Sequence, residues 1–291
     1  MALINVGASF PSYMWAVVRL LLASGGKLDE NSAKDLLTPP TLTAGENDEY
    51  DLAVRSLTDL GVVAKTNGTV ELTAAARALS LDDIAGFTGL LRRSVLDPSR
   101  NMGLAERDDL DGPKDLVRAL AWFLTRDPVA PLDWDAVGNL QDGAFPSHLP
   151  PPFANNARWD RFVYWAPALG LAAKPLLDEG GAAKLVPDCT VAVRETALGL
   201  WKKGQSVSPS EAVARIIAEL PVLPGGAYSR SLGLTVPEGE VSQSLSNALL
   251  TGDKADWITL DRQSDAGDVV FLADAGGTRI GVSNFTINGS E

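Results

Sequence analysis

Glycine and aspartate are concentrated in residues 260–282, LDRQSDAGDVVFLADAGGTRIGV, and both residue types are common in phosphate and metal sites. A phosphate-binding loop needs a glycine run that leads into a helix, followed by lysine and then serine or threonine. The segment ADAGGTRIG instead joins two apolar runs and has no such lysine. Asp265 and Asp268 supply two carboxylates, fewer than the roughly six to eight oxygens that calcium takes. These residues are therefore predicted to form turns between strands, with no metal and no cofactor.

Residue types for nucleophilic or histidine-based catalysis are scarce. The only histidine, His148, lies in the proline-rich segment FPSHLPPPF without an evident partner, which argues against Ser-His-Asp and histidine-metal chemistry. The only cysteine, Cys189, has apolar neighbours in LVPDCTVAV, so a buried and inert thiol is favoured over a reactive one. Adjacent carboxylates such as Asp108 and Asp109 fit a solvated surface or a helix cap. No catalytic residue is predicted.

Two groups of side chains suit contact with nucleic acid. Near the C-terminal end, neutral hydrogen-bonding groups of the kind that read base edges are accompanied by cations that suit phosphates. These candidates are Gln243, Ser244, Asn247, Lys254, Arg262 and Arg279. In the middle of the chain, cations lie beside aromatic residues, a pattern typical of proteins that stack single-stranded bases. These candidates are Arg92, Arg93, Arg158, Arg161, Lys202 and Lys203.

Both groups also have structural explanations. The tryptophans of the middle group recur at helical spacing, which favours a buried core with cations at its rim. Lys202 and Lys203 fit compensation of a helix C-terminus. Aspartates such as Asp253, Asp256 and Asp261 lie among the C-terminal candidates and oppose phosphate binding. DNA contact is thus the less favoured of the two interpretations for each group.

The charge distribution bears on the choice of partner. The 291 residues carry a net charge of −12, which argues against broad, non-specific binding of nucleic acid. Residues 1–88 carry 6 basic and 11 acidic side chains, residues 205–291 carry 5 and 11, and the middle is balanced. A single cysteine excludes an internal disulfide, and the N-terminus lacks the basic start of a signal peptide. A cytoplasmic protein without membrane contact is expected.

Short helices and hairpins are predicted to position these residues. Three helices are predicted: one from Pro11 that stops at Gly25-Gly26, one over residues 29–37 and one over residues 47–60. They precede two strands joined at Asn67-Gly68, the order of a winged helix. The third helix carries Asp48, Glu49, Asp51 and Asp59 against Arg55, so protein contact or core packing is favoured there over DNA. Residues 240–287 repeat the pattern, with one helix and then short strands over 257–260, 268–272 and 279–287.

The predicted fold class is therefore mainly α with small β-hairpins (α+β). Winged-helix domains are expected over residues 1–100 and 226–291. Residues 101–225 are expected to form a helical middle domain, which is a candidate for a second helix-turn-helix unit.

The two ends of the chain resemble a known family. The opening PSYMWAVVRLLLASGGKLDENSAKDLLTPPTL and the ending QSLSNALLTGDKADWITLDRQSDAGDVVFLADAGGTRIGVSNFTI look like the DpdG proteins. Those belong to bacterial gene clusters linked to 7-deazapurine DNA modification and anti-phage defence. The resemblance implies a non-catalytic winged-helix subunit that works beside helicase and nuclease partners, and it supplies no functional residues.

Three functions are consistent with these observations. The favoured one is an interaction and recognition subunit of a bacterial defence or DNA-processing assembly. Its expected partners are other protein subunits, with a helicase or a nuclease as candidates. DNA would be contacted locally or through these partners. The first alternative is a winged-helix transcriptional regulator, dimeric on a palindromic operator. The second is an enzyme whose site is assembled from scattered carboxylates.

Overall fold

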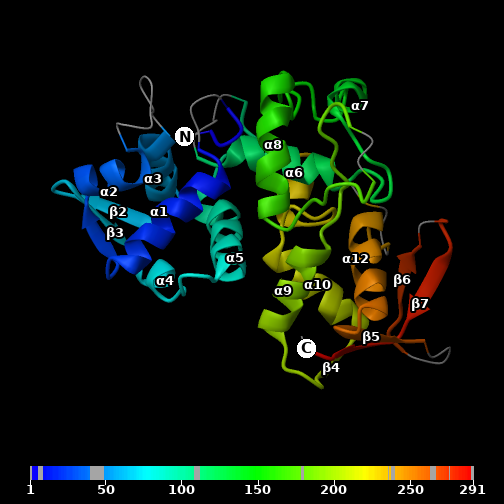
Figure 1. Cartoon of the computed structure of the whole chain (residues 1–291). Helices are drawn as coiled ribbons and strands as arrows, with labels where there is room; N and C mark the ends of the chain where they lie inside the picture. The colour runs from blue at the N-terminus through cyan, green and yellow to red at the C-terminus, as the bar shows by residue number, and fades with distance from the viewer. Residues whose placement is uncertain are drawn as a thin grey trace. The chain divides into compact units, whose positions relative to one another are not determined.

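The computed structural model describes residues 2–5, 9–39, 49–107, 112–177, 180–234, 236, 240–262, 267–274 and 276–289. Within these ranges it has twelve α-helices and small antiparallel sheets of two or three strands (Figure 1). The predicted fold class is confirmed at this level. Four aspartates considered in the sequence lie outside the described residues: Asp48, Asp108, Asp109 and Asp265.

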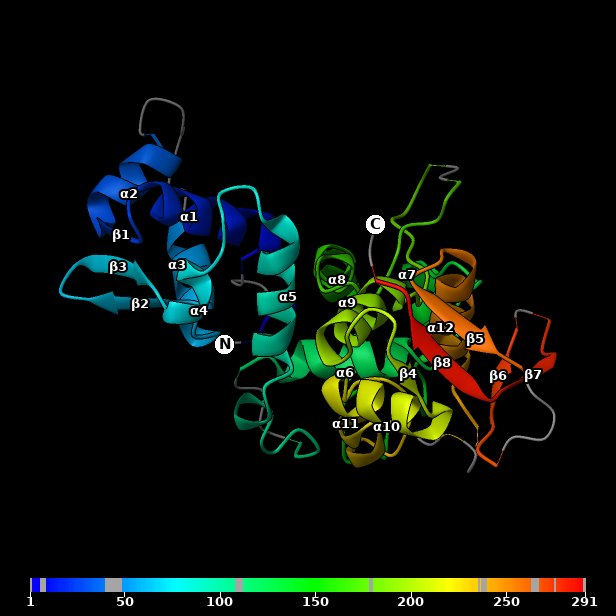
Figure 2. The same cartoon turned by 90° about the horizontal axis from the view of Figure 1, so that it is seen from below.

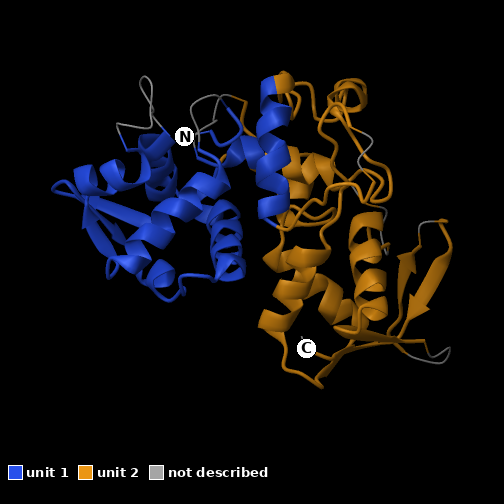
Figure 3. Cartoon of the chain, in the orientation of Figure 1, with its two compact units in different colours: residues 1–102, 108–116, 157–169 blue, residues 103–107, 117–156, 170–291 orange. Residues whose placement is uncertain are grey.

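The chain divides into two compact units (Figure 3). Unit 1 comprises residues 1–102, 108–116 and 157–169, and unit 2 comprises residues 103–107, 117–156 and 170–291. These units do not coincide with the three predicted domains, whose independent folding stays a prediction. Among the described helices, none combines the length and apolar character that crossing a membrane requires.

Unit 1 begins with three helices and three strands. They are α1 (Pro11–Ala23), β1 (Lys27–Asp29), α2 (Glu30–Leu37), α3 (Glu49–Asp59), β2 (Val63–Thr66) and β3 (Thr69–Leu72). The strands form an antiparallel sheet in the order β1-β3-β2. Strand β1 was not predicted, whereas the three helices and the hairpin were. Asp29 caps α2, because its carboxylate accepts a hydrogen bond of 2.9 Å from the backbone of Ser32.

The turn between β2 and β3 has the predicted geometry. Asn67 and Gly68 have φ angles of 51° and 75°, the left-handed region that a two-residue hairpin turn requires. The core beneath the sheet and helices is apolar and fully buried, as shown by the 0% exposure of Met14, Val18, Leu21, Leu57 and Val70. The spacing of aliphatic residues along α1 and α3 therefore places one apolar stripe of each helix in this core.

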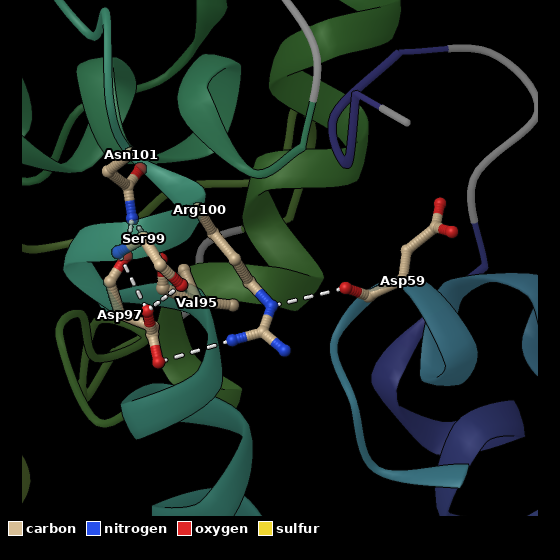
Figure 4. A network of polar contacts seen from close by, with 6 residues as sticks. All are labelled: Asp59, Val95, Asp97, Ser99, Arg100 and Asn101. Atoms are coloured by element: carbon tan, nitrogen blue, oxygen red, sulfur yellow. Dashed lines mark hydrogen bonds and ion pairs between the residues drawn. The ribbon is translucent and has the colours of Figure 1, made fainter. Parts of the chain in front are cut away.

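A second layer follows the sheet in unit 1. It contains α4 (Ala74–Arg77), α5 (Ile84–Val95) and a short 3₁₀ helix (Pro98–Arg100). Asp83 caps α5, because its carboxylate accepts a hydrogen bond of 2.8 Å from the backbone of Gly86. After α5, Nε of Arg100 donates to the backbone carbonyl of Asp59 at 3.1 Å. Its Nη1 atom lies 3.2 Å from Oδ2 of Asp97 (Figure 4). This network fixes the 3₁₀ helix against the end of α3.

Three helices follow: α6 (Lys114–Phe123), α7 (Trp134–Leu140) and α8 (Asn156–Ala168). The first three residues of α6 belong to unit 1 and the rest to unit 2, whereas α8 after Asn156 belongs to unit 1. The large rings of α8 face the core, with Trp159 1% exposed and Phe162 and Trp165 0% exposed. The interpretation of these aromatic residues as core is confirmed.

Unit 2 continues with a second set of helices and strands. In chain order they are α9 (Thr190–Leu200), β4 (Ser206–Val207), α10 (Pro209–Glu219), α11 (Ala227–Ser231), α12 (Gln243–Lys254), β5 (Ile258–Asp261), β6 (Val270–Ala273), β7 (Arg279–Val282) and β8 (Asn284–Ile287). Strand β8 lies between β4 and β5, and β6 pairs with β7 as a separate hairpin (Figure 2). The sheet thus joins residues from both sides of the boundary predicted at residue 226.

Residues 279–287, predicted as one strand, form two. Val282 pairs with Val270 in the hairpin, whereas Asn284 pairs with Asp261 in the three-stranded sheet. Between them, Ser283 donates from its backbone and its hydroxyl to the carbonyl of Asp261, at 2.9 and 3.1 Å. These two bonds hold the residue at which the chain passes from one sheet to the other.

One order of elements occurs once in each unit. In unit 1 it is α1-β1-α2-α3 followed by β2 and β3, and β3 pairs with β1. In unit 2 it is α9-β4-α10-α11-α12 followed by β5 to β8, and β8 pairs with β4. The helix before the last strands packs mainly against the first helix of the set, α3 against α1 and α12 against α9. The repeat predicted between the two ends therefore extends back to α9.

Candidate nucleic-acid interface

Helix α12 carries most of the C-terminal candidates. Ser242 caps it, with its hydroxyl accepting from the backbone of Leu245 at 3.4 Å. Leu245 and Leu249 are fully buried, which orients the helix through its apolar stripe. The opposite stripe is polar: Gln243 and Lys254 are exposed and Asn247 is half-buried.

Ser244 does not share that polar stripe. Its side chain is 1% exposed, and its hydroxyl lies 3.3 Å from that of Ser242. One residue along a helix turns by about 100°, so Ser244 faces inward when Gln243 and Asn247 face outward. The solvent-facing candidates on α12 are therefore Gln243, Asn247 and Lys254.

The remaining C-terminal cations differ in their surroundings. The Nη2 atom of Arg262 lies 4.0 Å from the carboxylate of Asp253, whose other oxygen accepts from the backbone of Leu260 at 2.9 Å. Arg279 is on β7, with its guanidinium carbon 4.8 Å from the centroid of the Phe271 ring. Within the described part of the chain, neither Lys254 nor Arg279 has an ion-pair partner.

A groove of about 420 Å³ lies beside the start of α12. Its walls come from the residues after α6, the segment before α12 and the β6–β7 hairpin. Two arginines line it, Arg126 and Arg279, together with Gln243 and Phe271. The Phe271 ring is 42% exposed, because it is on the outward side of β6 whereas its neighbour Leu272 is fully buried.

Arg126 was not among the sequence candidates. Its guanidinium carbon lies 5.2 Å from the centroid of the Trp122 ring, and Nε and Nη2 donate to the hydroxyl of Thr125 at 3.0 and 2.7 Å. Burial lowers the pKa of this guanidinium, which nevertheless stays protonated at neutral pH. The Arg126 side chain is therefore a cation whose orientation is restricted by Trp122 and Thr125 at the wall of the groove.

The aspartates of the glycine-rich segment have structural roles. Asp274 accepts from the backbone of Gly276 at 2.9 Å and of Thr278 at 2.7 Å, which closes the β6–β7 turn. Asp268 accepts from the hydroxyl of Ser210 at 2.5 Å, and this bond lowers the pKa of its carboxyl. Among the described residues, no three His, Cys, Asp or Glu side chains gather closely enough to hold a metal ion. For its described residues, the segment forms turns as predicted.

The middle group is divided between the two units. Arg92 is buried and donates from Nη1 to the carbonyl of Leu169 at 3.0 Å, whereas Arg93 is exposed. Arg158 and Arg161 are half-buried on α8, where the guanidinium carbon of Arg161 lies 5.0 Å from the centroid of the Phe10 ring. All four belong to unit 1. The tryptophan between them is buried, so it offers no face for a base.

Lys202 and Lys203 belong to unit 2 and are exposed just after α9. Lys203 lines a second groove, of about 480 Å³, with Arg194 and Asp256. The neighbouring Trp201 is 5% exposed, and the guanidinium carbon of Arg215 lies 5.5 Å from its centroid. Here too the ring is covered, which fits a cation at the rim of a core.

The corresponding surface of unit 1 has a different charge. Four of its cations are paired with carboxylates: Lys34 with Asp51 at 2.6 Å, Lys65 with Glu30 at 2.5 Å, Arg19 with Asp82 at 3.2 Å, and Arg77 with Glu71. On the exposed side of α3 lie Glu49, Arg55 and Asp59. A hydrogen bond to Glu49 raises the pKa of the Tyr13 hydroxyl. This surface presents more negative than positive charge.

Comparison with known proteins identifies one relationship. The DpdG family, described as DpdG-like, matches residues 1–266. No curated protein and no solved structure matches the chain.

Proposed function

The chain belongs to the DpdG-like family, and from this premise we propose that it is a non-catalytic recognition subunit built on two winged-helix modules. The first module, residues 11–72, contacts a protein partner of the assembly. The second module, residues 190–287, contacts DNA through α12 and the β6–β7 hairpin. Family membership supports a role in 7-deazapurine DNA modification and anti-phage defence.

The strand order supports the winged-helix assignment and is the observation that carries the proposal. Each module closes with a three-stranded antiparallel sheet in which the last strand lies between the first and the second, β1-β3-β2 and β4-β8-β5. In winged-helix proteins the helix before the last two strands enters the major groove of DNA. That helix is α3 in the first module and α12 in the second.

Charge supports different partners for the two modules. A helix that enters the major groove must approach phosphates, and the exposed Glu49 and Asp59 of α3 would repel them. On α12, Gln243 and Asn247 offer neutral amides, which pair well with adenine edges. Lys254 and Arg279 supply cations for the backbone. The two modules are therefore suited to protein and DNA, respectively.

DNA contact is tested by measuring the affinity of the full chain for a duplex at two salt concentrations. The expected dissociation constant is on the order of 1–100 µM at physiological salt, and tighter at low salt, as for sequence-independent binding. Substitution of both Asn247 and Lys254 by alanine is expected to weaken binding several-fold. The matched control is Lys65→Ala in the first module, which is expected to leave the affinity unchanged.

Each of three results would overturn part of the proposal. Absence of salt-sensitive duplex binding would remove the DNA contact. Nanomolar, sequence-specific binding by the chain alone would instead indicate a transcriptional regulator. Release of product from nucleotides or nucleic acid by the purified chain would indicate an enzyme.

Protein contact is tested by co-expression with the products of neighbouring genes. The double variant Glu49→Lys, Asp59→Lys reverses the charge of the α3 surface and is expected to lose association with the partner while keeping duplex affinity. The double variant Asn247→Ala, Lys254→Ala is expected to behave in the opposite way. Loss of association in both variants, or in neither, would contradict the division between the modules.

A further inference from the structure

We propose that the groove beside α12 binds one unpaired nucleotide of a DNA strand, with the base against the Phe271 ring and the adjoining phosphates at Arg126 and Arg279. This inference rests on the proposed function, because it specifies which part of a DNA ligand the second module holds. It concerns the groove that adjoins the exposed stripe of α12 and shares Gln243 with it.

The size of the groove selects the ligand. Its volume of about 420 Å³ falls within the range of small-molecule sites, roughly 300–1,000 Å³. A base with its sugar and a phosphate fits such a space. A double helix does not, because its major groove alone is about 12 Å wide, wider than a space of this volume. Only a nucleotide that has left the base stack can enter.

The two arginines select for phosphate. Each guanidinium is held over an aromatic ring, Arg126 over Trp122 and Arg279 over Phe271, at 5.2 and 4.8 Å from the ring centroids. Such stacking restricts the orientation of the guanidinium plane. Arg126 already donates from Nε and Nη2 to the hydroxyl of Thr125, which leaves its Nη1 for a phosphate. Neither arginine has an ion pair with a described residue. Both charges therefore remain available to an anion in the groove.

Phe271 supplies a surface for a base. Phe271 lines the groove and 42% of its area is exposed, so its ring has an uncovered part. Stacking on aromatic rings is the usual way in which proteins hold unpaired bases, and it tolerates any sequence. An aromatic ring beside two cations distinguishes this groove from a site for free phosphate.

Glu240 is the only acidic side chain among the described residues that line the groove. It opposes phosphate, but a carboxylate also accepts hydrogen bonds from base amino groups. With Arg126 and Arg279, the described lining keeps an excess of one positive charge. This composition suits a ligand with one or two phosphates and a base better than a polyphosphate.

The groove is continuous with the polar stripe of α12. Gln243 lines the groove and also lines a small adjoining pocket with Asn247, and Asp127 and Asp274 complete the polar lining of that pocket. A strand that leaves the groove therefore reaches the amides assigned to DNA contact. This continuity favours a nucleotide within a strand over a free nucleotide.

The experiment compares the affinities of the full chain for four fluorescent probes: a single strand, a duplex with one bulged nucleotide, a perfect duplex and a mononucleotide. The bulged duplex or the single strand is expected to bind about ten-fold more tightly than the perfect duplex, as one stacked base allows. The mononucleotide is expected to bind most weakly. Preference for the bulge indicates an extruded nucleotide, and preference for the single strand indicates an open strand.

Variants assign the preference to the groove. Phe271→Ala is expected to abolish this preference, so that the single strand and the bulged duplex bind no more tightly than the perfect duplex, and Phe271→Tyr is expected to retain it. Arg126→Gln is expected to weaken binding of the preferred probe about five-fold, by loss of one phosphate contact. The control Lys203→Gln removes an exposed cation of the same unit outside the groove. Equal melting temperatures establish that each variant is folded.

The outcomes separate this inference from the proposed function. Equal affinity for all strand-containing probes, or a preference that survives Phe271→Ala, would overturn the groove assignment while perfect-duplex binding through α12 stood. Binding of unpaired nucleotides that depends on Phe271, without any perfect-duplex binding, would support the groove and overturn the duplex contact. If the mononucleotide bound most tightly, the ligand of the groove would be a free nucleotide, and the proposal of a nucleotide within a strand would be overturned.

Discussion

The Oδ1 atom of Asp115 accepts a hydrogen bond of 2.9 Å from the backbone N–H of Leu3, 112 residues earlier in the chain. Its Oδ2 atom accepts from the backbone of Ile4 at 2.8 Å. The carboxylate is 2% exposed, and burial raises its pKa against the opposing effect of these bonds. A buried acid at the start of α6 thus ties down the beginning of the chain.

Replacement of Asp115 by alanine is expected to lower the free energy of unfolding by about 3 kcal/mol, because buried backbone donors lose their acceptor. Asp115→Asn retains one acceptor oxygen and is expected to lose less. Urea denaturation of both variants measures the difference. Equal stability of wild type and Asp115→Ala would show that water replaces the carboxylate at no cost.

Tyr50 provides a prediction for alkaline pH. Burial, and then the charges of Glu30 and Asp51, raise the pKa of its hydroxyl to about 12, whereas an unfolded tyrosine titrates near 10. Between these values the folded state holds a proton that the unfolded state has lost, so stability falls as pH rises from about 10 to 12. Tyr50→Phe is expected to lose less stability over this range.

The measurement is the urea midpoint of wild type and Tyr50→Phe at pH 8 and pH 10.5. At pH 8 the variant is expected to be at least as stable, because the hydroxyl has no hydrogen-bond partner among the described residues. Parallel loss of stability in the two proteins would contradict the raised pKa.

Gly252 marks close packing between α12 and β5. A Cβ atom at this position would lie 2.3 Å from Cζ2 of Trp257 and 2.9 Å from Cγ2 of Ile258. Gly252→Ala is therefore expected to destabilise the protein by about 1–3 kcal/mol. The matched control is Gly199→Ala on α9, where a Cβ meets nothing within 4 Å and helix propensity predicts a gain of about 0.5–1 kcal/mol. Thermal denaturation of the two variants should move in opposite directions.

Cys189 is predicted to be unreactive in the folded protein. It is fully buried, its Sγ atom donates to the carbonyl of Ser244 at 3.4 Å, and burial raises the pKa of its thiol. A thiol-specific reagent at pH 8 should label it only after addition of denaturant. Stoichiometric labelling without denaturant, at the rate of a free thiol, would contradict this assignment.

Much of the fold could be predicted because its signals are local. The spacing of Val17, Val18 and Leu21 defines α1, and Asn67-Gly68 defines a turn by its φ angles. Strands β1 and β4 have three and two residues, too few for a periodic pattern. Their existence depends on pairing with β3 and β8, and distant pairing leaves no mark in a single sequence.

The candidate site was predictable only in part. The polar stripe of α12 follows from its sequence, but the inward orientation of Ser244 depends on which stripe packs on α9. Arg126 and Phe271 are 145 positions apart in the sequence, and tertiary structure alone brings them to one groove. Alternation along β6 indicates that Phe271 faces outward, and this was the one signal that could have drawn attention to it.

Strand β8 is the last to be synthesised of the three that form the sheet of the second module, although it occupies the central position. During translation, β4 and β5 therefore emerge from the ribosome with unsatisfied inner edges, and they stay so until residues 284–287 follow. Open strand edges promote association between nascent chains. A chain that stops between residues 261 and 284 would lack β8 and would keep the inner edges of both β4 and β5 open.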